Sequence, residues 1–213
     1  MGTAELKSAL RARIWAARRT MDQRERESAG ERIAAHGRAW AQANVAEGGT
    51  VTAYLGVGAE PPTLALLESL HAEGLRVLLP VCLPGSQLGW VEWRPGIAFV
   101  RSRYAPVQEP EGPVIGAVDV ASGDGAAGRA PLGAIVLPAT ALDAAGRRLG
   151  QGGGYYDRFL ARLDTLGVRV PTAAVVYDGE LLAEGGVPDE PLDRRVGTAL
   201  TPAGAIALGS NRE

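Results

Sequence analysis

The residues best suited to chemistry lie in one short stretch, LGQGGGYYDRFL, which spans residues 149–160. Four glycines and Gln151 precede two tyrosines and an aspartate, which begin a pattern typical of a helix. Glycine has no Cβ, so backbone N–H groups can approach an anion closely, and the first N–H groups of a helix carry partial positive charge. The stretch therefore predicts a phosphate-binding loop, with a glycine-rich turn of no further function as the alternative.

This loop matches neither common nucleotide-binding signature. It contains no Gly-Lys-Ser/Thr, and Tyr155 stands where the dinucleotide fingerprint needs its third glycine. Asp157, in the first helical turn, would repel a phosphate unless a cation lay between them. Mg²⁺ takes one or two carboxylates together with phosphate oxygens, so it is the metal that this arrangement favours. Asp189 or Asp193 could supply a second carboxylate, although alone they are typical of solvated loop acids.

The elements around the loop indicate an α/β fold. Apolar periodicity predicts helices over residues 4–19, 21–43, 64–73 and 155–166. Apolar, β-branched runs predict strands over residues 50–55, 76–82, 88–93, 130–138, 168–177 and 196–200. The order predicts a doubly wound, mostly parallel sheet with helices on both faces, an irregular segment at 104–131 and a loop at 139–154. The glycines would then follow the carboxyl end of a strand, where ligands of open α/β sheets bind.

Length and composition indicate one domain over residues 1–213, in which residues 1–45 form a helical pair packing on the sheet. The net charge of −2 argues against a nucleic-acid-binding protein, although the first 40 residues hold nine basic and five acidic side chains. Apolar runs are too short to span a membrane, and no signal peptide is visible. Cys82, the one cysteine, lies in an apolar run and predicts a core residue. We expect a cytoplasmic monomer that binds neither nucleic acid nor membrane.

A longer segment, PATALDAAGRRLGQGGGYYDRFLARL at residues 138–163, resembles the signature of the 5-formyltetrahydrofolate cyclo-ligase family, also called 5,10-methenyltetrahydrofolate synthetases. The family has a doubly wound layer sandwich like that of sugar-phosphate isomerases and CoA-transferases. Outlying residues that extend the resemblance, in chain order, are Lys7, Arg11, Glu60, Leu79-Pro80, Glu109-Pro110, Asp189, Asp193 and Thr198. Departures from it include Leu142, where phenylalanine is usual, Gln151, where tyrosine or arginine is usual, and Tyr177-Asp178, where many members have a Gln-containing turn.

The resemblance implies a reaction in which ATP and Mg²⁺ convert 5-formyltetrahydrofolate, with or without a polyglutamate tail, to 5,10-methenyltetrahydrofolate, ADP and phosphate. It implies that Lys7 and Arg148 are catalytic, and that Asp157 and Asp189 hold Mg²⁺. The implied ATP-binding residues are Lys7, Arg11, Arg148, Leu149, Gly150, Gln151, Gly152, Gly153, Gly154, Tyr155 and Tyr156. The implied folate-binding residues are Leu55, Glu60, Gln151, Gly152, Gly153, Gly154 and Tyr155.

Two alternatives stay open on the sequence. A divergent family member would bind ATP but act on another amide-like substrate, with Glu60 and Gln151 as the residues to test. A non-catalytic nucleotide- or RNA-binding protein would use the basic N-terminal helices, and its affinity for polyanions would fall with salt. Asp157, Asp189 and Arg148 favour an enzyme, because a binding module has no need of a metal pair.

Overall fold

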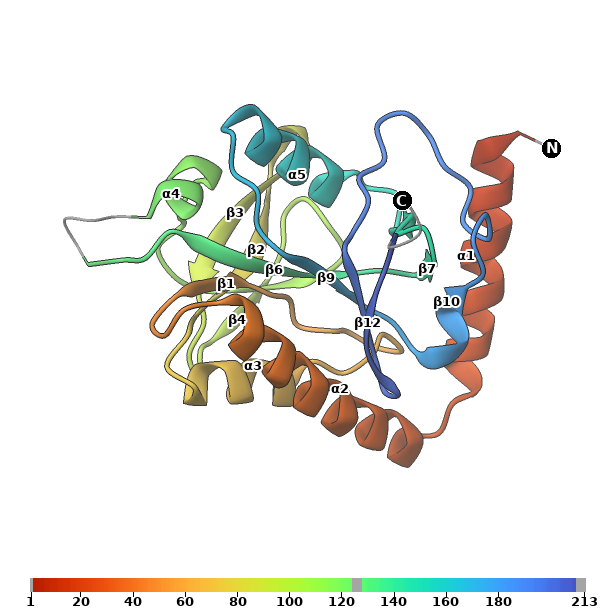
Figure 1. Cartoon of the computed structure of the whole chain (residues 1–213), viewed down its shortest axis with the longest axis horizontal. Coiled ribbons are helices and arrows are strands. Elements are labelled where there is room, and N and C mark those ends of the chain that lie inside the picture. The colour runs from red at the N-terminus through yellow and green to blue at the C-terminus, as the bar shows by residue number, and fades with distance from the viewer. Residues whose placement is uncertain (1, 124–127, 210–213) are drawn as a thin grey trace.

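A seven-stranded sheet forms the centre of the computed structural model, which describes residues 2–123 and 128–209. The strand order is β12-β11-β9-β6-β1-β2-β3. These strands are β1 (Thr50–Thr52), β2 (Arg76–Leu83), β3 (Gln87–Glu92), β6 (Leu132–Pro138), β9 (Thr172–Val175), β11 (Thr198–Thr201) and β12 (Gly204–Ala207). The five inner strands pair in parallel, and β3 and β12 run antiparallel at the two edges. The predicted doubly wound, mostly parallel sheet is confirmed (Figure 1).

Helices cover both faces of this sheet. One face packs against α2 (Gln23–Asn44) and α3 (Leu64–Ala72), and the other against α4 (Ala117–Ser122) and α5 (Tyr155–Thr165). Successive residues of a strand point to opposite faces. Within β2, Val77 and Leu79 accordingly join the α2/α3 side of the core, while Leu78 joins the α4/α5 side. Apolar residues on both faces explain why the inner strands are continuous hydrophobic runs.

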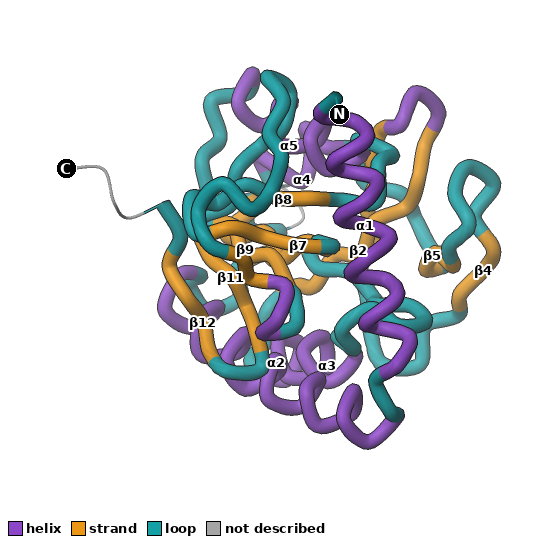
Figure 2. The backbone as a smooth tube through the Cα atoms, turned by 90° about the vertical axis from the view of Figure 1, so that its right-hand side faces the viewer, coloured by secondary structure: helices purple, strands orange, loops and turns teal. Residues whose placement is uncertain are grey.

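The first helix, α1 (Thr3–Thr20), packs elsewhere. Its Leu10 and Ile14 contact a small three-stranded sheet made of β10 (Leu181–Leu182), β7 (Ala141–Asp143) and β8 (Arg148–Leu149). Figure 2 shows α1 running alongside this small sheet. Of the predicted helical pair, α2 therefore packs on the main sheet, and α1 is placed beside the segment that holds the glycine loop.

Two predicted irregular segments contain more structure than we expect from the sequence. The predicted loop at 139–154 includes β7 and β8, which pair antiparallel around a turn stabilised by the buried carboxylate of Asp143. The segment at 104–131 includes β5 (Gln108–Pro110), paired with β4 (Phe99–Arg101), and also α4; residues 124–127 of this segment lie outside the described part. Short 3₁₀ turns occur at Pro84–Ser86 and Asp178–Glu180.

Candidate active site

The glycine loop, residues 150–154, joins β8 to the N-terminus of α5. Gly154 is the N-cap of α5 and has a φ of 69°, a left-handed conformation that favours glycine. A Cβ on Gly150 would lie 2.7 Å from the Arg148 Nη1 atom, so any larger residue here would require the guanidinium to shift. The loop therefore brings backbone N–H groups and a buried cation to one helix N-terminus, as an anion site requires.

Arg148 and Asp157 form an ion pair at the base of the loop. The Arg148 Nη2 atom donates to both Asp157 carboxylate oxygens at 2.9 Å, and only 4% of the arginine side chain is exposed. Asp157 Oδ1 also accepts a hydrogen bond from the backbone N–H of Arg194 at 3.1 Å. This pair ties α5 to β8 and to the segment near the C-terminus.

Helix α1 closes over the loop with residues four apart, which share one helix face. Arg11 Nε donates to the Gly150 carbonyl oxygen at 2.7 Å. Lys7 is buried and donates from Nζ to Glu190 at 2.8 Å and to Asp193. Burial alone would lower the pKa of Lys7, but its hydrogen bonds with Asp193 and Glu190 outweigh burial and raise that pKa, so the ammonium stays charged. The predicted ATP-binding cations of α1 therefore lie at the glycine loop and at the tail segment that contacts Asp157.

The loop after β1 brings Glu60 to the same place. Thr63 fixes this loop, because its hydroxyl accepts from the Gly56 N–H at 2.8 Å and donates to the Tyr54 carbonyl at 2.6 Å. Glu60 Oε1 accepts from Gln151 Nε2 at 3.2 Å, so two residues predicted on the folate side are in contact. Leu55 is half-buried and packs against the α2/α3 side of the core.

The predicted metal-binding residues Asp157 and Asp189 have different partners in the structure. Asp189 pairs with Arg147 at 3.2 Å and Arg195 at 3.3 Å, and makes no hydrogen bond to Asp157 or Lys7 among the described residues. Asp193 instead contacts Lys7, and the next backbone N–H, that of Arg194, binds Asp157. Asp193 is therefore next in the chain to a residue that binds Asp157, whereas Asp189 is held by two arginines.

The donor set fits Mg²⁺ bound together with phosphate. Within residues 2–123 and 128–209 no three His, Cys, Asp or Glu side chains group as a metal site would need. Mg²⁺ bound through one or two carboxylates and substrate phosphates needs no such group. Asp157, with Asp189 or Asp193, would supply the one or two carboxylates that this mode of binding asks for.

Several buried polar atoms near the loop have no hydrogen-bond partner among the described residues. They are Thr140 Oγ1, Arg148 Nε and Tyr156 Oη, whereas others, such as Thr52 Oγ1, Arg76 Nη2 and Trp90 Nε1, lie elsewhere in the fold. Burial raises the pKa of Tyr156, so its hydroxyl stays protonated and available as a donor. Buried polar atoms are normally paired, so unpaired donors gathered around one loop are typical of a site that receives a polar ligand.

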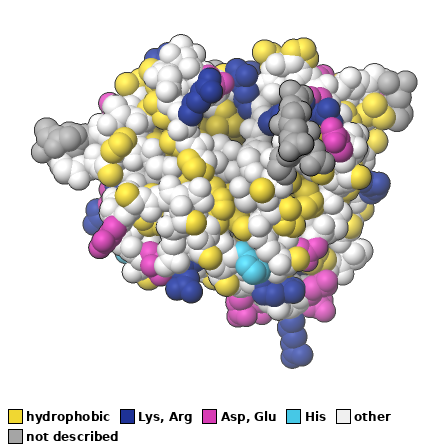
Figure 3. All heavy atoms as spheres, in the orientation of Figure 1, with side chains coloured by type: hydrophobic (Ala, Val, Ile, Leu, Met, Phe, Trp, Pro, Cys, Tyr) yellow, Lys and Arg dark blue, Asp and Glu magenta, His cyan; other side chains and the backbone are white. Residues whose placement is uncertain are grey.

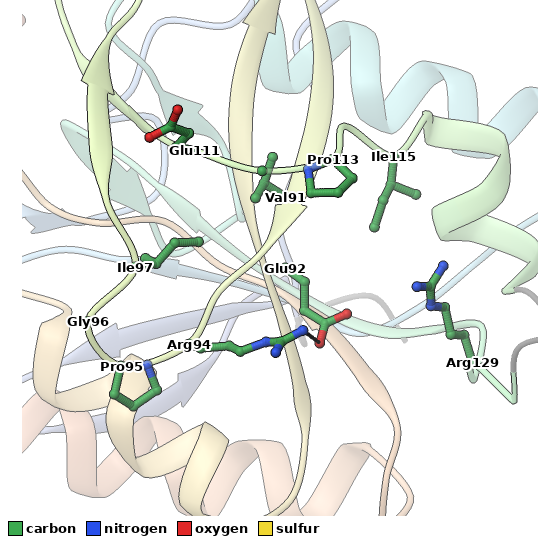
Figure 4. Close-up of a pocket in the computed structure, with 11 residues that line it drawn as sticks. Val91, Glu92, Arg94, Pro95, Gly96, Ile97, Glu111, Pro113, Ile115 and Arg129 are labelled. Carbon is green, nitrogen blue, oxygen red and sulfur yellow. Dashed lines mark ion pairs between the residues drawn. The ribbon is translucent and has the colours of Figure 1, made fainter.

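Two clefts lie away from the glycine loop. The candidate site is therefore identified by its side chains and not by the size of a cavity. A cleft of about 430 Å³ is lined by Glu92, Arg94, Ile97 and Arg129 among others, and Figure 4 shows the Glu92–Arg94 ion pair in its lining. The neighbouring cleft of about 390 Å³ includes Arg76, the first residue of β2. Both lie at the amino ends of the strands, opposite the glycine loop, and Glu92 already pairs with Arg76 and Arg94.

Sequence reasoning missed Trp15 and Glu190. Trp15 Nε1 donates to Gln151 Oε1 at 3.1 Å, and its spacing of four from Arg11 is a signal that could have found it. Glu190 meets Lys7 across the length of the chain, and no local pattern indicates that contact. Cys82, predicted as a core residue, is half-buried instead; burial and the nearby Glu109 carboxylate raise the pKa of its thiol to about 11.

Comparison with known proteins gives one consistent result. The family described as "5-formyltetrahydrofolate cyclo-ligase family" matches residues 3–202. A 5-formyltetrahydrofolate cyclo-ligase of Mycolicibacterium smegmatis is 36% identical over 208 residues, which cover 95% of this chain and 97% of that protein. The protein of the same name from Escherichia coli K12 is 34% identical over 113 residues, covering 52% of this chain and 57% of its own.

Solved structures show the same fold. A 5,10-methenyltetrahydrofolate synthetase from Mycoplasma pneumoniae superimposes with a TM-score of 0.68 at 17% identity, covering 92% of this chain and 98% of its own. The protein of that name from Aquifex aeolicus has a TM-score of 0.68 at 22% identity, covering 98% of this chain and 95% of its own. Separately, the described residues contain no helix long and apolar enough to cross a membrane.

Proposed function

The chain belongs to the 5-formyltetrahydrofolate cyclo-ligase family, and we propose that it converts 5-formyltetrahydrofolate to 5,10-methenyltetrahydrofolate with ATP and Mg²⁺. The observation that carries the proposal is the glycine loop at the N-terminus of α5, with Arg148 buried beneath it and Arg11 bound to Gly150. The family match includes the loop and both cations, since it runs from residue 3 to residue 202.

The chemistry calls for positioning and charge stabilisation more than for a protein nucleophile. The oxygen of a formamide is a poor leaving group, so N10 cannot expel it directly. If the formyl oxygen attacks the γ-phosphorus, ADP leaves, and the oxygen becomes part of a phosphate ester. N10 then attacks the formyl carbon and loses its proton, and phosphate departs with the former formyl oxygen. Phosphoryl transfer of this kind depends on fixed cations and in-line placement.

We assign the phosphate side of the site to α1 and the glycine loop. Lys7, Arg11 and Arg148 would bind the phosphate oxygens together with the N–H groups of the loop. In this structure Lys7 is paired with Glu190 and Asp193, so a phosphate that binds Lys7 would release Asp193. Asp157 and Asp193 would then hold Mg²⁺, which supplies positive charge beside the transferred phosphoryl group.

We assign the folate side to Glu60 and Gln151, which are already in contact. A pterin ring presents adjacent N–H donors, and the Glu60 carboxylate offers acceptors for them. Gln151 lies in the glycine loop, between the proposed nucleotide side and Glu60. The reacting formyl group would therefore sit next to the loop that holds the γ-phosphate.

A direct assay tests the proposal. Purified protein is mixed with 5-formyltetrahydrofolate, Mg²⁺ and ATP, and the methenyl chromophore is followed by absorbance, with ATP omitted as the control. We expect a signal that grows only when ATP is present. Absence of the signal, with ATP binding still detected by calorimetry, would overturn the assignment of the substrate and favour the alternative of another amide-like compound.

The second alternative, an RNA-binding protein, gains no support from the surface of α2. Basic residues of α2 such as Arg24 and Arg26 alternate with Glu25 and Glu27. Figure 3 shows both acidic and basic side chains along the lower edge of the molecule, where α2 runs. A surface of mixed charge does not form the single-sign stripe that binds a phosphate backbone.

A further inference from the structure

Three elements meet in a short hydrogen-bonded chain at the edge of the site. Trp15, on α1, donates from its indole Nε1 to Gln151 Oε1 at 3.1 Å. Gln151, in the glycine loop, donates from Nε2 to Glu60 Oε1 at 3.2 Å. Glu60 lies in the loop after β1, and its second carboxylate oxygen accepts from the Val57 N–H at 3.1 Å.

The indole fixes the direction of the Gln151 amide. An indole N–H is a donor and never an acceptor, so the amide must turn its oxygen toward Trp15. The amide NH₂ then faces Glu60, where a donor is required. Without Trp15 the exposed Gln151 side chain would keep only one anchor, its contact with Glu60, and could turn away from the carboxylate.

Trp15 is itself held by a buried charge. The Arg18 guanidinium lies 5.2 Å from the centre of the Trp15 ring and 5.8 Å from that of Tyr177. Arg18 is 1% exposed and donates to both oxygens of Glu180, at 2.7 and 2.8 Å. The Tyr177 hydroxyl donates to the Glu60 carbonyl oxygen at 3.3 Å. One arginine thus supports both aromatic rings that flank the Glu60 loop.

We propose that Trp15 is a positioning residue for the folate side of the site and acts through Gln151. With one hydrogen bond already on each oxygen, the Glu60 carboxylate keeps a free lone pair on each. A carboxylate held in this way is preorganised for a planar heterocycle with two adjacent N–H donors. The inference rests on the proposed function, because it takes the pterin ring of the folate as that heterocycle.

The test compares Trp15→Phe, Gln151→Leu and the double variant. Affinity for 5-formyltetrahydrofolate is measured by calorimetry with a non-hydrolysable ATP analogue and Mg²⁺ at saturation. Trp15→Phe keeps an aromatic ring against Arg18 and removes the N–H, so we expect a dissociation constant about threefold to tenfold higher, as for the loss of one hydrogen bond. Because Trp15 acts through Gln151, the double variant should bind no more weakly than Gln151→Leu alone.

Two further measurements separate positioning from general damage. The KM for ATP should stay at the wild-type value in Trp15→Phe while the KM for the folate rises. Gln42→Leu is the matched control, because Gln42 makes the same amide–carboxylate contact with Glu73 at 2.8 Å on α2, away from the loop. That control should leave folate affinity unchanged.

The outcomes distinguish this inference from the proposed function. Unchanged folate affinity in Trp15→Phe, or an equal loss in the wild-type and Gln151→Leu backgrounds, would overturn the role of Trp15 while wild-type turnover stands. Failure of the wild-type protein to bind 5-formyltetrahydrofolate or to form the methenyl product would overturn the proposed function, and the inference with it.

Discussion

At the scale of single residues, the charged groups of the site are already paired with one another. Arg148 is bound to Asp157, and Lys7 to Glu190 and Asp193. If the proposed function is right, a phosphate would exchange with carboxylates that the protein supplies. Mg²⁺ would make this exchange favourable, because it could take up the carboxylates that the cations release.

Asp157→Asn tests this exchange. Asparagine keeps an oxygen that can accept from the Arg194 N–H, so we expect the fold to survive. It removes the negative charge, so affinity for Mg²⁺–ATP should fall by about tenfold or more, and turnover should fall with it. Calorimetry of nucleotide binding with and without Mg²⁺, followed by the absorbance assay, measures both effects.

Asp164→Asn is the control for that variant. Asp164 lies on the same helix, is exposed, and pairs with Arg194 at 3.5 Å. It should behave as the wild-type protein does. Wild-type kinetics and Mg²⁺ dependence in Asp157→Asn would contradict the assignment of Asp157 to the metal.

Some residues of the candidate site could be predicted from the sequence, and others could not. Lys7, Arg11, Glu60 and the glycine loop could be found because their types and order match a family signature, and the structure brings Arg11 to the loop and Glu60 to Gln151. The assignment to ATP, folate or metal stays a prediction. The choice between Asp189 and Asp193 depends on how an irregular segment folds back on α1, and side-chain type says nothing about that.

At the scale of elements, α1 packs on the small three-stranded sheet and not on the main sheet as the other helices do. Leu10 and Ile14 pack on the three-stranded sheet, and Arg18 adds a buried ion pair with Glu180. Burial alone would lower the pKa of Arg18, but hydrogen bonding and the charge of Glu180 raise it, so the guanidinium stays ionised. The position of Lys7, Arg11 and Trp15 therefore depends on this attachment.

Glu180→Gln should weaken that attachment. The change leaves a buried guanidinium without a counter-charge, so we expect the free energy of unfolding to fall by about 3 kcal/mol. Urea denaturation followed by circular dichroism measures this loss. Arg38→Ala is the control, since Arg38 and Glu73 form a half-exposed pair at 3.2 Å that should contribute less than about 1 kcal/mol. Equal losses in the two variants would contradict the structural role of Glu180.

Helices and long strands were predictable because packing against a sheet imposes a regular apolar pattern. The predicted helix at 155–166 and the strand at 76–82 differ from α5 and β2 by one residue at one end. The small sheet was missed because β8 has two residues and β10 has two, too few to show periodicity. The start of α2 also differs from the predicted residue 21: Asp22 is the N-cap, and its side chain accepts from the Glu25 N–H.

At the scale of the whole molecule, the parallel sheet separates two regions. The glycine loop, α1 and the tail segment that holds Asp193 gather beyond the carboxyl ends of the strands, whereas the clefts lined by Arg76, Arg94 and Arg129 lie at the amino ends. Open α/β sheets bind ligands at the carboxyl edge. The clefts thus indicate a ligand site at the amino edge of the sheet, whereas the topology indicates one at the carboxyl edge. An experiment on the intact protein can decide which edge binds the nucleotide.

Hydrogen exchange on the intact protein can show which edge of the sheet binds the nucleotide. With Mg²⁺ and a non-hydrolysable ATP analogue, amides of α1, of the glycine loop and of residues 187–195 should exchange more slowly, because ligand binding suppresses the local opening that exposes them. Amides within residues 91–97, which lie at the amino edge, serve as the internal control and should exchange at the unliganded rate. If protection centred on that second group, the nucleotide would bind at the amino edge, and the assignment of Lys7, Arg11 and Arg148 to phosphate would be wrong. Protection confined to the carboxyl edge would leave the topology of the sheet as the better guide to the site than the volume of its clefts.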